Sequence, residues 1–375
     1  MKYKPTTRGL LLSMGVVGLI FTLAAAQAPL APSASISNGM VKAKLWLPDA
    51  NDGYYRSTRF DWSGSIWSLE TGGHSYFGQW FAKYDPMKHD SITGPVEDWA
   101  PLNYDEAKPG ETFVKVGVGV LKKIDDQPYK FSVIYPVLDY GKWTVKTGPD
   151  YVQYQHELND PKSGYGYNYT KTVRLTPGKQ QMTITQNLKN TGTKAIATNF
   201  YNHGFFMLDS QPTGPDVTVT FPFEANAVRP MSPAAEVRGN QIVYLQELQP
   251  QPERNPNAST TAGPASATAP GAVSDANPAR IGGRGAAAGR PLAVASSVID
   301  GFSLTDPKDF DIRVENHRTD AGVRITADRP LWKINFWSTR TTVCPEAYVE
   351  VKADSGKETS WRLTYDFYSL PAGGR

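Results

Sequence analysis

Residues 173–188 read VRLTPGKQQMTITQNL, and this stretch indicates how the rest of the chain folds. Two runs in which apolar and polar residues alternate flank Pro177 and Gly178, a pair typical of tight turns. Alternation with a period of two places every second side chain on the same face of a β-strand. The stretch therefore predicts a β-hairpin with one face against a core.

The same pattern recurs along the chain. Residues 311–330 (DIRVENHRTDAGVRITADRP) predict a second hairpin that turns near residues 320–322, and in residues 360–370 (SWRLTYDFYSL) large apolar residues alternate with polar ones. Short segments of this kind, punctuated by Gly, Pro, Asn and Asp, follow one another with almost nothing at helical period. We expect an all-β protein built as a large antiparallel β-sandwich.

Composition limits the partners. The 375 residues, 11% of them aromatic, suffice for one large all-β domain. The net charge of +3 arises from 39 basic and 36 acidic residues with no polybasic run. Nucleic acid and anionic membrane surfaces are therefore poor candidate partners, and small neutral ligands fit better.

The first 26 residues have the pattern of an export signal. Basic residues precede an apolar run that closes on Ala24, Ala25 and Ala26, which predicts a signal peptide over residues 1–26, cleaved before Gln27. We expect a periplasmic or secreted protein without membrane association after cleavage. An uncleaved membrane anchor is the alternative, because the apolar run approaches the length needed to span a bilayer. The single cysteine, Cys344, allows no internal disulfide.

One segment differs in composition from the rest. Residues 250–291 consist mainly of Pro, Ala, Gly, Ser and Thr and contain no aromatic residue, so they cannot bury enough apolar surface to fold. Because strand patterns of the same kind flank the segment, we interpret it as a disordered loop inserted into a single domain, residues 27–375. A boundary between two domains is the alternative.

The chain contains five histidines, and one stands in an unusual context. In residues 198–208 (TNFYNHGFFML), His203 lies among aromatic residues in an otherwise strand-like run. A buried imidazole needs partners for its ring nitrogens, unless the strand ends there and the ring faces a cleft. His74, after a Gly-Gly turn, and His317, in a polar turn, are expected at the surface.

Motifs for most catalytic classes are missing. The sequence has no zinc spacing, no glycine loop that opens a helix, no nucleophile elbow and no calcium loop, so we expect neither a metal nor a cofactor. Aromatic faces beside polar groups are what a sugar pocket needs. A metal site formed by His89, Asp90 and Glu97 is the alternative by ligand type.

Several segments resemble aldose 1-epimerases (galactose mutarotases). Residues 198–208 resemble the Asn-His-Ser-Tyr-Phe segment whose histidine is the general acid. Residues 87–99 (MKHDSITGPVEDW) resemble the first sugar-binding histidine loop, and residues 341–351 (TTVCPEAYVEV) resemble the segment that carries the general base. Residues 53–67 (GYYRSTRFDWSGSIW) occupy the place of the early arginine loop. These matches follow the chain order of the family.

The resemblance implies a galactose mutarotase-like supersandwich and an aldose 1-epimerase. Glu346 would remove the proton from the C1 hydroxyl of a sugar, and His203, as imidazolium, would protonate the ring oxygen. The sugar would be held by Arg59 (or Arg56), His89 and Asp300, the last by its position in the chain. No metal or nucleotide takes part in this chemistry.

We expect an enzyme of this kind to have His203 and Glu346 facing one cavity, with a sugar's width between their reactive atoms. The alternative is a non-catalytic carbohydrate-binding protein on the same fold, which needs only an aromatic wall. The partner in either case is a small-molecule carbohydrate. The identity of the sugar and the oligomeric state do not follow from the sequence.

Overall fold

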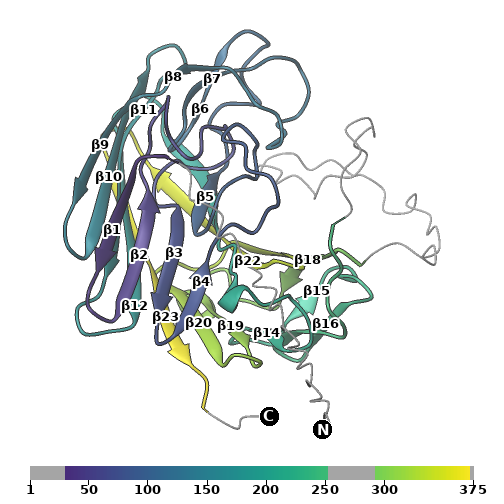
Figure 1. The fold of residues 1–375 in the computed structure, drawn as a ribbon. Coiled ribbons are helices and arrows are strands. Elements are labelled where there is room, and N and C mark those ends of the chain that lie inside the picture. The colour runs from purple at the N-terminus through teal and green to yellow at the C-terminus, as the bar shows by residue number, and fades with distance from the viewer. Residues whose placement is uncertain (1–29, 252–291, 372–375) are drawn as a thin grey trace, which may run out of the picture. The chain divides into compact units, whose positions relative to one another are not determined.

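Strands form nearly all the regular structure in residues 30–251 and 292–371, the part of the chain that this computed structural model describes. They build four sheets there, and every pairing within them is antiparallel (Figure 1). Two short 3-10 helices, η1 (Leu208–Ser210) and η3 (Pro307–Asp309), accompany the strands in this described part. The expectation of an all-β protein with large antiparallel sheets is confirmed.

The largest sheet has ten strands. In spatial order they are β16 (Ala235–Arg238), β17 (Gln241–Tyr244), β14 (Val217–Thr220), β19 (Asp311–Asn316), β20 (Ala321–Ala327), β23 (Glu358–Ser369), β12 (Gln181–Asn190), β11 (Tyr165–Leu175), β10 (Tyr151–Asp160) and β9 (Lys142–Thr147).

The second sheet has six strands and carries the candidate site. Its order is β15 (Asn226–Ala227), β18 (Val294–Asp300), β21 (Lys333–Thr339), β22 (Thr342–Ala353), β13 (Ile196–His203) and β5 (Val96–Trp99).

Two smaller sheets complete the described part. One contains β1 (Ser33–Ser37), β2 (Val41–Trp46), β3 (Ile66–Thr71) and β4 (His74–Phe77), and the other contains β6 (Thr112–Lys115), β7 (Gly119–Lys122) and β8 (Val137–Asp139).

Both expected hairpins are present. The strands β11 and β12 pair from Tyr167 opposite Asn190 to Leu175 opposite Met182, and Gly178 adopts a left-handed φ of 69° in the turn between them. Buried and partly exposed residues alternate along β10 and β12, as expected for strands with one face on a core. The strands β19 and β20 form the second hairpin.

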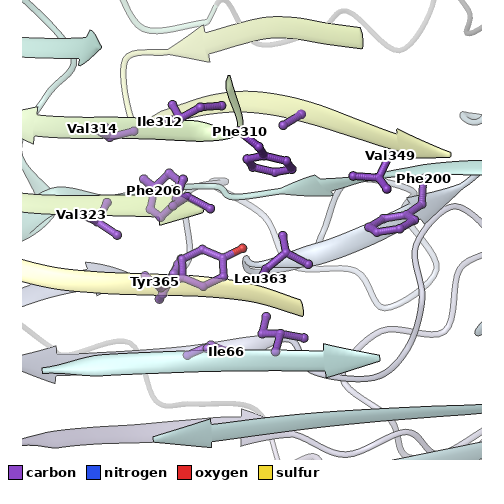
Figure 2. Close-up of a cluster of buried hydrophobic side chains, with 14 of the residues drawn as sticks. Ile66, Phe200, Phe206, Phe310, Ile312, Val314, Val323, Val349, Leu363 and Tyr365 are labelled. Atoms are coloured by element: carbon purple, nitrogen blue, oxygen red, sulfur yellow. The ribbon is translucent and has the colours of Figure 1, made fainter. Parts of the chain in front are cut away.

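The ten-stranded and six-stranded sheets share one hydrophobic core, in which β22 packs on β12 and β23. Figure 2 shows side chains from both sheets meeting there, among them Phe200 and Val349 from the smaller sheet and Leu363 and Tyr365 from the larger. Burying a large apolar side chain of this kind stabilises the fold by about 1.5–3 kcal/mol.

The expected signal peptide, residues 1–26, and nearly all of the Pro/Ala/Gly-rich segment, residues 250–291, lie outside the described residues. Within the described residues, none of the helices is both long enough and apolar enough to span a bilayer.

Candidate active site

Strand β13 ends at His203, so the aromatic run around this residue marks the end of a strand. Gly204 follows because a Cβ atom there would lie only 2.4 Å from the ring of Phe206. Phe205 then takes a left-handed φ of 44°. Its ring stacks on the imidazole of His203, with the ring centroids 3.6 Å apart and the planes 7° from parallel.

His203 and Glu346 touch each other. The Nε2 atom of His203 lies 3.2 Å from Oε1 of Glu346, and the two side chains are only 3% and 6% exposed. The second carboxylate oxygen of Glu346 accepts a hydrogen bond of 2.6 Å from the amide of Asn335, its register partner on β21. We expected the two reactive atoms to be separated by the width of a sugar, and this expectation is wrong for this structure.

Burial determines how this pair ionises. It raises the pKa of Glu346 to about 7, whereas burial and the nearby Arg59 cation lower the pKa of His203 well below its usual value. A charged carboxylate and a charged imidazolium both lose hydration at this depth, so the neutral forms are favoured. Glu346 is therefore protonated below pH about 7 while His203 is neutral, the reverse of the ionisation that the family resemblance implies.

Arg59 belongs to a buried network centred on Asp98. Its Nε atom donates to Asp98 Oδ2 at 2.9 Å, and its terminal nitrogen donates to the Tyr201 hydroxyl at 2.7 Å. Lys115 donates to the other oxygen of Asp98 at 2.8 Å. Burial alone would raise the pKa of Asp98, but Lys115 and Arg59 outweigh burial and lower it. The guanidinium is thus held in one orientation beside the His203–Glu346 pair.

His89 lies close to this network, and an aromatic ring joins them. The guanidinium carbon of Arg59 is 4.1 Å from the centroid of Phe131, and the half-buried imidazole of His89 meets the same ring edge-on at 5.5 Å. Arg56 does not join them: its guanidinium donates to the backbone carbonyl of Asn51. Of the two arginines, Arg59 is the one beside the pair.

Asp300 is not brought to the cluster. It is exposed at the end of β18, where it pairs in register with Asn226. Among the described residues, no hydrogen bond or ion pair connects it with His203, Glu346 or Arg59.

Aromatic side chains surround the pair. Trp337 meets the His203 ring edge-on at 5.6 Å, and Trp80 stacks on Phe205 with the centroids 4.9 Å apart. Both tryptophans are partly exposed. They form an aromatic rim beside the buried acid and base, and a rim of this kind suits the C–H face of a sugar.

Sequence reasoning missed Asn335, Trp337, Asp98 and Tyr201. A sequence signal for the first two exists: in residues 333–337 (KINFW), Lys333, Asn335 and Trp337 alternate with Ile and Phe, which puts these three on one face of a strand. In the structure Asn335 is the register partner of Glu346. A signal for Asp98 is the adjacent acidic pair inside β5, whose four residues are all buried.

The alternative metal site is wrong. Glu97 is fully buried and forms an ion pair with Lys171, and Asn202 also donates to it at 3.2 Å. No group of three or more His, Cys, Asp or Glu side chains that could hold a metal ion occurs among residues 30–251 and 292–371.

No protein-family model matches the sequence, and no curated protein matches it. Similar folds occur among solved structures. A galactose mutarotase-like protein from Clostridium acetobutylicum is 10% identical (TM-score 0.49), with 90% of this chain and 95% of that chain covered. The GalM/aldose epimerase homologue from C. elegans is 11% identical (TM-score 0.48), with 91% and 100% covered. A galactose mutarotase related enzyme from Lactobacillus acidophilus is 12% identical (TM-score 0.47), with 91% and 98% covered.

Proposed function

We propose that this protein binds an aldose and interconverts its anomers, with Glu346 and His203 as the acid–base pair. The observation that carries the proposal is the contact between a buried carboxyl group and a buried imidazole, 3.2 Å apart, whose pKa values are shifted in opposite directions. An acid and a base with opposite shifts in pKa are the usual sign of acid–base work in one site.

The reaction requires its acid and its base to lie next to each other, as His203 and Glu346 do. Ring opening removes a proton from the C1 hydroxyl and delivers one to the ring oxygen. Both oxygens are bonded to C1, so the acid and the base must lie side by side rather than on opposite sides of the sugar. In the proposed complex the two sugar oxygens replace the contact that His203 Nε2 and Glu346 Oε1 make with each other.

The proton balance is also satisfied. The carboxylic acid of Glu346 gives its proton to the ring oxygen while the imidazole of His203 takes the proton of the C1 hydroxyl, and the ring opens to the aldehyde. Rotation about C1–C2 exposes the other face of the carbonyl. Closure then runs the transfers backwards, with the Glu346 carboxylate as base and the His203 imidazolium as acid. The pair never gains a net charge, which would be costly at this depth.

The surrounding side chains position the sugar. Arg59, whose orientation is fixed by Asp98 and Tyr201, supplies hydrogen-bond donors for hydroxyl groups. Trp337 and Trp80 offer rings for the C–H face of the sugar.

The test is the rate at which a panel of aldoses approaches anomeric equilibrium, followed by polarimetry or NMR. We expect the wild type to accelerate at least one aldose, and Glu346→Gln and His203→Asn each to reduce the acceleration about 100-fold or more. Glu350→Gln is the matched control, because Glu350 lies exposed on the same strand, β22. Unchanged rates in Glu346→Gln would contradict the proposal.

A non-catalytic carbohydrate-binding protein is the second candidate. It is favoured by the burial of His203 and Glu346 and by their contact, since each side chain provides the other with a polar partner in the absence of any ligand. Calorimetric binding of a sugar whose anomers equilibrate at the spontaneous rate would select this candidate.

We also propose that the protein is exported and cleaved before Gln27, from the basic, apolar and small-residue pattern of its first 26 residues. N-terminal sequencing of the protein recovered from an expressing bacterium tests this: a first residue of Gln27 supports cleavage, and a retained leader contradicts it.

A further inference from the structure

A second group of reactive side chains lies outside the candidate sugar site. It joins three segments that are far apart in the sequence: His74 begins β4, Asp209 lies in η1, and Ser369 ends β23. His74 Nδ1 is 2.9 Å from Asp209 Oδ2, and His74 Nε2 is 3.0 Å from the hydroxyl oxygen of Ser369. A hydroxyl, an imidazole and a carboxylate are thus connected in the order that nucleophilic catalysis requires.

The carboxylate of Asp209 is itself held in place. The backbone N–H of Ser75 donates to Asp209 Oδ1 at 2.8 Å, while the other oxygen faces His74. Burial alone would raise the pKa of Asp209, but the Ser75 N–H and the contacts with neighbouring side chains outweigh burial and lower it. An ionised carboxylate at Nδ1 keeps the proton on that nitrogen and leaves Nε2 as a base toward Ser369.

The backbone at Asp209 is strained. Asp209 (φ 51°, ψ 28°) and the next residue, Ser210 (φ 55°), both adopt left-handed conformations that non-glycine residues rarely take. Strain of this kind persists only where surrounding contacts impose it, and it gathers at functional sites. Here it accompanies the contact between the Asp209 carboxylate and His74.

The side-chain amide of Gln180 lies near Ser369, beside Gly72. Gly72 has a left-handed φ of 60°, and a Cβ atom built on it would lie 3.0 Å from the amide nitrogen of Gln180 and 3.8 Å from the hydroxyl oxygen of Ser369. A side chain at position 72 would therefore press against the Gln180 amide, so the glycine lets this N–H donor lie near the Ser369 hydroxyl. A donor in this place can stabilise the oxyanion that forms when a hydroxyl adds to a carbonyl.

From this geometry we propose that Ser369, His74 and Asp209 form a hydrolytic triad for esters of short carboxylic acids, with Gln180 as the oxyanion donor. Short acyl groups are chosen because Ser369, Gly72 and Gly73 are all exposed, which leaves the carbonyl site open to solvent.

The proposed steps balance. The Ser369 oxygen adds to the ester carbonyl carbon while its proton passes to His74 Nε2. The bond from that carbon to the alcohol oxygen then breaks, and the alcohol leaves with the proton from Nε2. Water adds to the acyl-serine in the same way, which releases the carboxylic acid and restores the serine hydroxyl.

The first test uses the purified full chain and p-nitrophenyl acetate. We expect the wild type to hydrolyse the ester above the solution rate, and Ser369→Ala and His74→Gln each to lose about 100-fold or more of that activity. Ser360→Ala is the matched control, because Ser360 is also exposed and lies on the same strand. A Ser369→Ala variant as active as the wild type would overturn the triad, including the case in which His74 alone hydrolyses the ester.

A second measurement does not depend on turnover. A fluorophosphonate should label the wild type at Ser369, located by peptide mass spectrometry, and should not label the His74→Gln variant; labelling elsewhere, or none, overturns the proposal. Asp209 is a positioning residue, so Asp209→Asn should lower kcat about 100-fold or more and leave KM unchanged. None of these variants should alter anomer interconversion, and Glu346→Gln should leave ester hydrolysis unchanged, so the two proposed functions fail separately.

Discussion

Glu97 and Asp98 are consecutive residues of β5, yet their carboxylates belong to two separate buried networks. Glu97 pairs with Lys171, and Asp98 pairs with Arg59 and Lys115. Successive side chains of a strand point to opposite faces, so one short strand supplies a counter-charge to each side of the sheet. The Asp98 side holds the arginine of the candidate sugar site, and the Glu97 side lies behind it.

Replacing Asp98 with Asn should destabilise the protein strongly. The change keeps the shape of the side chain but leaves Arg59 and Lys115 buried without their shared anion. We expect the free energy of unfolding, measured by urea denaturation, to fall by about 3–5 kcal/mol.

Asp216→Asn is the control for this variant, because Asp216 pairs with Arg318 in an exposed position. Its effect should stay below about 1 kcal/mol. Equal effects of the two variants would contradict a buried charge network around Asp98.

Lys171→Met tests the other network. Lys171 is 1% exposed and pairs with both Asp61 and Glu97, so its removal leaves two buried carboxylates with no cation between them. We expect a loss of about 3–5 kcal/mol at neutral pH. Protonation relieves the repulsion, so the deficit relative to the wild type should shrink as the pH is lowered.

The exposed pair of Lys194 with Glu106 provides the control. Lys194→Met should change stability by less than about 1 kcal/mol at every pH. A Lys171→Met deficit that is independent of pH would show that lost packing, not charge, causes it.

The two hairpins were predictable because alternation and a turn signal are local in the sequence. His203 was predictable as a candidate because it interrupts a strand-like run with a polar group, and Glu346 because the segment around it resembles the one that carries the general base of aldose 1-epimerases. Their contact was not, since it depends on the pairing of β13 with β22, which joins segments more than a hundred residues apart. The role of Asp98 was hidden for the same reason: its partners come from separate loops and sheets.

His74 shows more clearly what local sequence patterns cannot predict. A Gly-Gly turn predicts a surface position, but the side chain of His74 is only 14% exposed, and its partners lie 135 and 295 residues away along the chain. Local patterns locate elements, and only the packing of distant elements shows which side chains meet.

Asn335→Ala should shift the pH dependence of anomer interconversion. Activity should fall above pH about 7, where Glu346 loses its proton. The hydrogen bond from Asn335 stabilises the carboxylate and lowers the pKa of Glu346, so its removal raises that pKa. We expect the alkaline limb of kcat/KM to move to higher pH.

The control for this shift is Asn187→Ala. The side chain of Asn187 donates a hydrogen bond to the exposed Ser360 hydroxyl on the ten-stranded sheet. Its profile should coincide with that of the wild type. If the alkaline limb does not move in Asn335→Ala, this limb does not reflect the ionisation of Glu346.

The opposite pKa shifts of Glu346 and His203 should appear in the pH dependence of stability. The pKa of Glu346 rises from 4.5 to about 7 on folding, so its contribution is fully present below pH 4.5 and is lost as the pH rises through 7, roughly 3 kcal/mol in all. The pKa of His203 falls from 6.5, so its contribution is present above pH 6.5 and is lost as the pH falls. Between pH 4.5 and 6.5 the two contributions oppose each other.

Each single variant should therefore reveal the contribution of the residue that remains. In His203→Asn, the free energy of unfolding relative to the His203→Asn/Glu346→Gln double variant should fall as the pH rises from 4.5 to 7, because only the unfolded state releases the Glu346 proton there. In Glu346→Gln it should fall as the pH drops below 6.5, because only the unfolded state takes up the His203 proton. Urea denaturation across this range measures both, and parallel curves for the two variants would mean that neither group is buried as the structure shows.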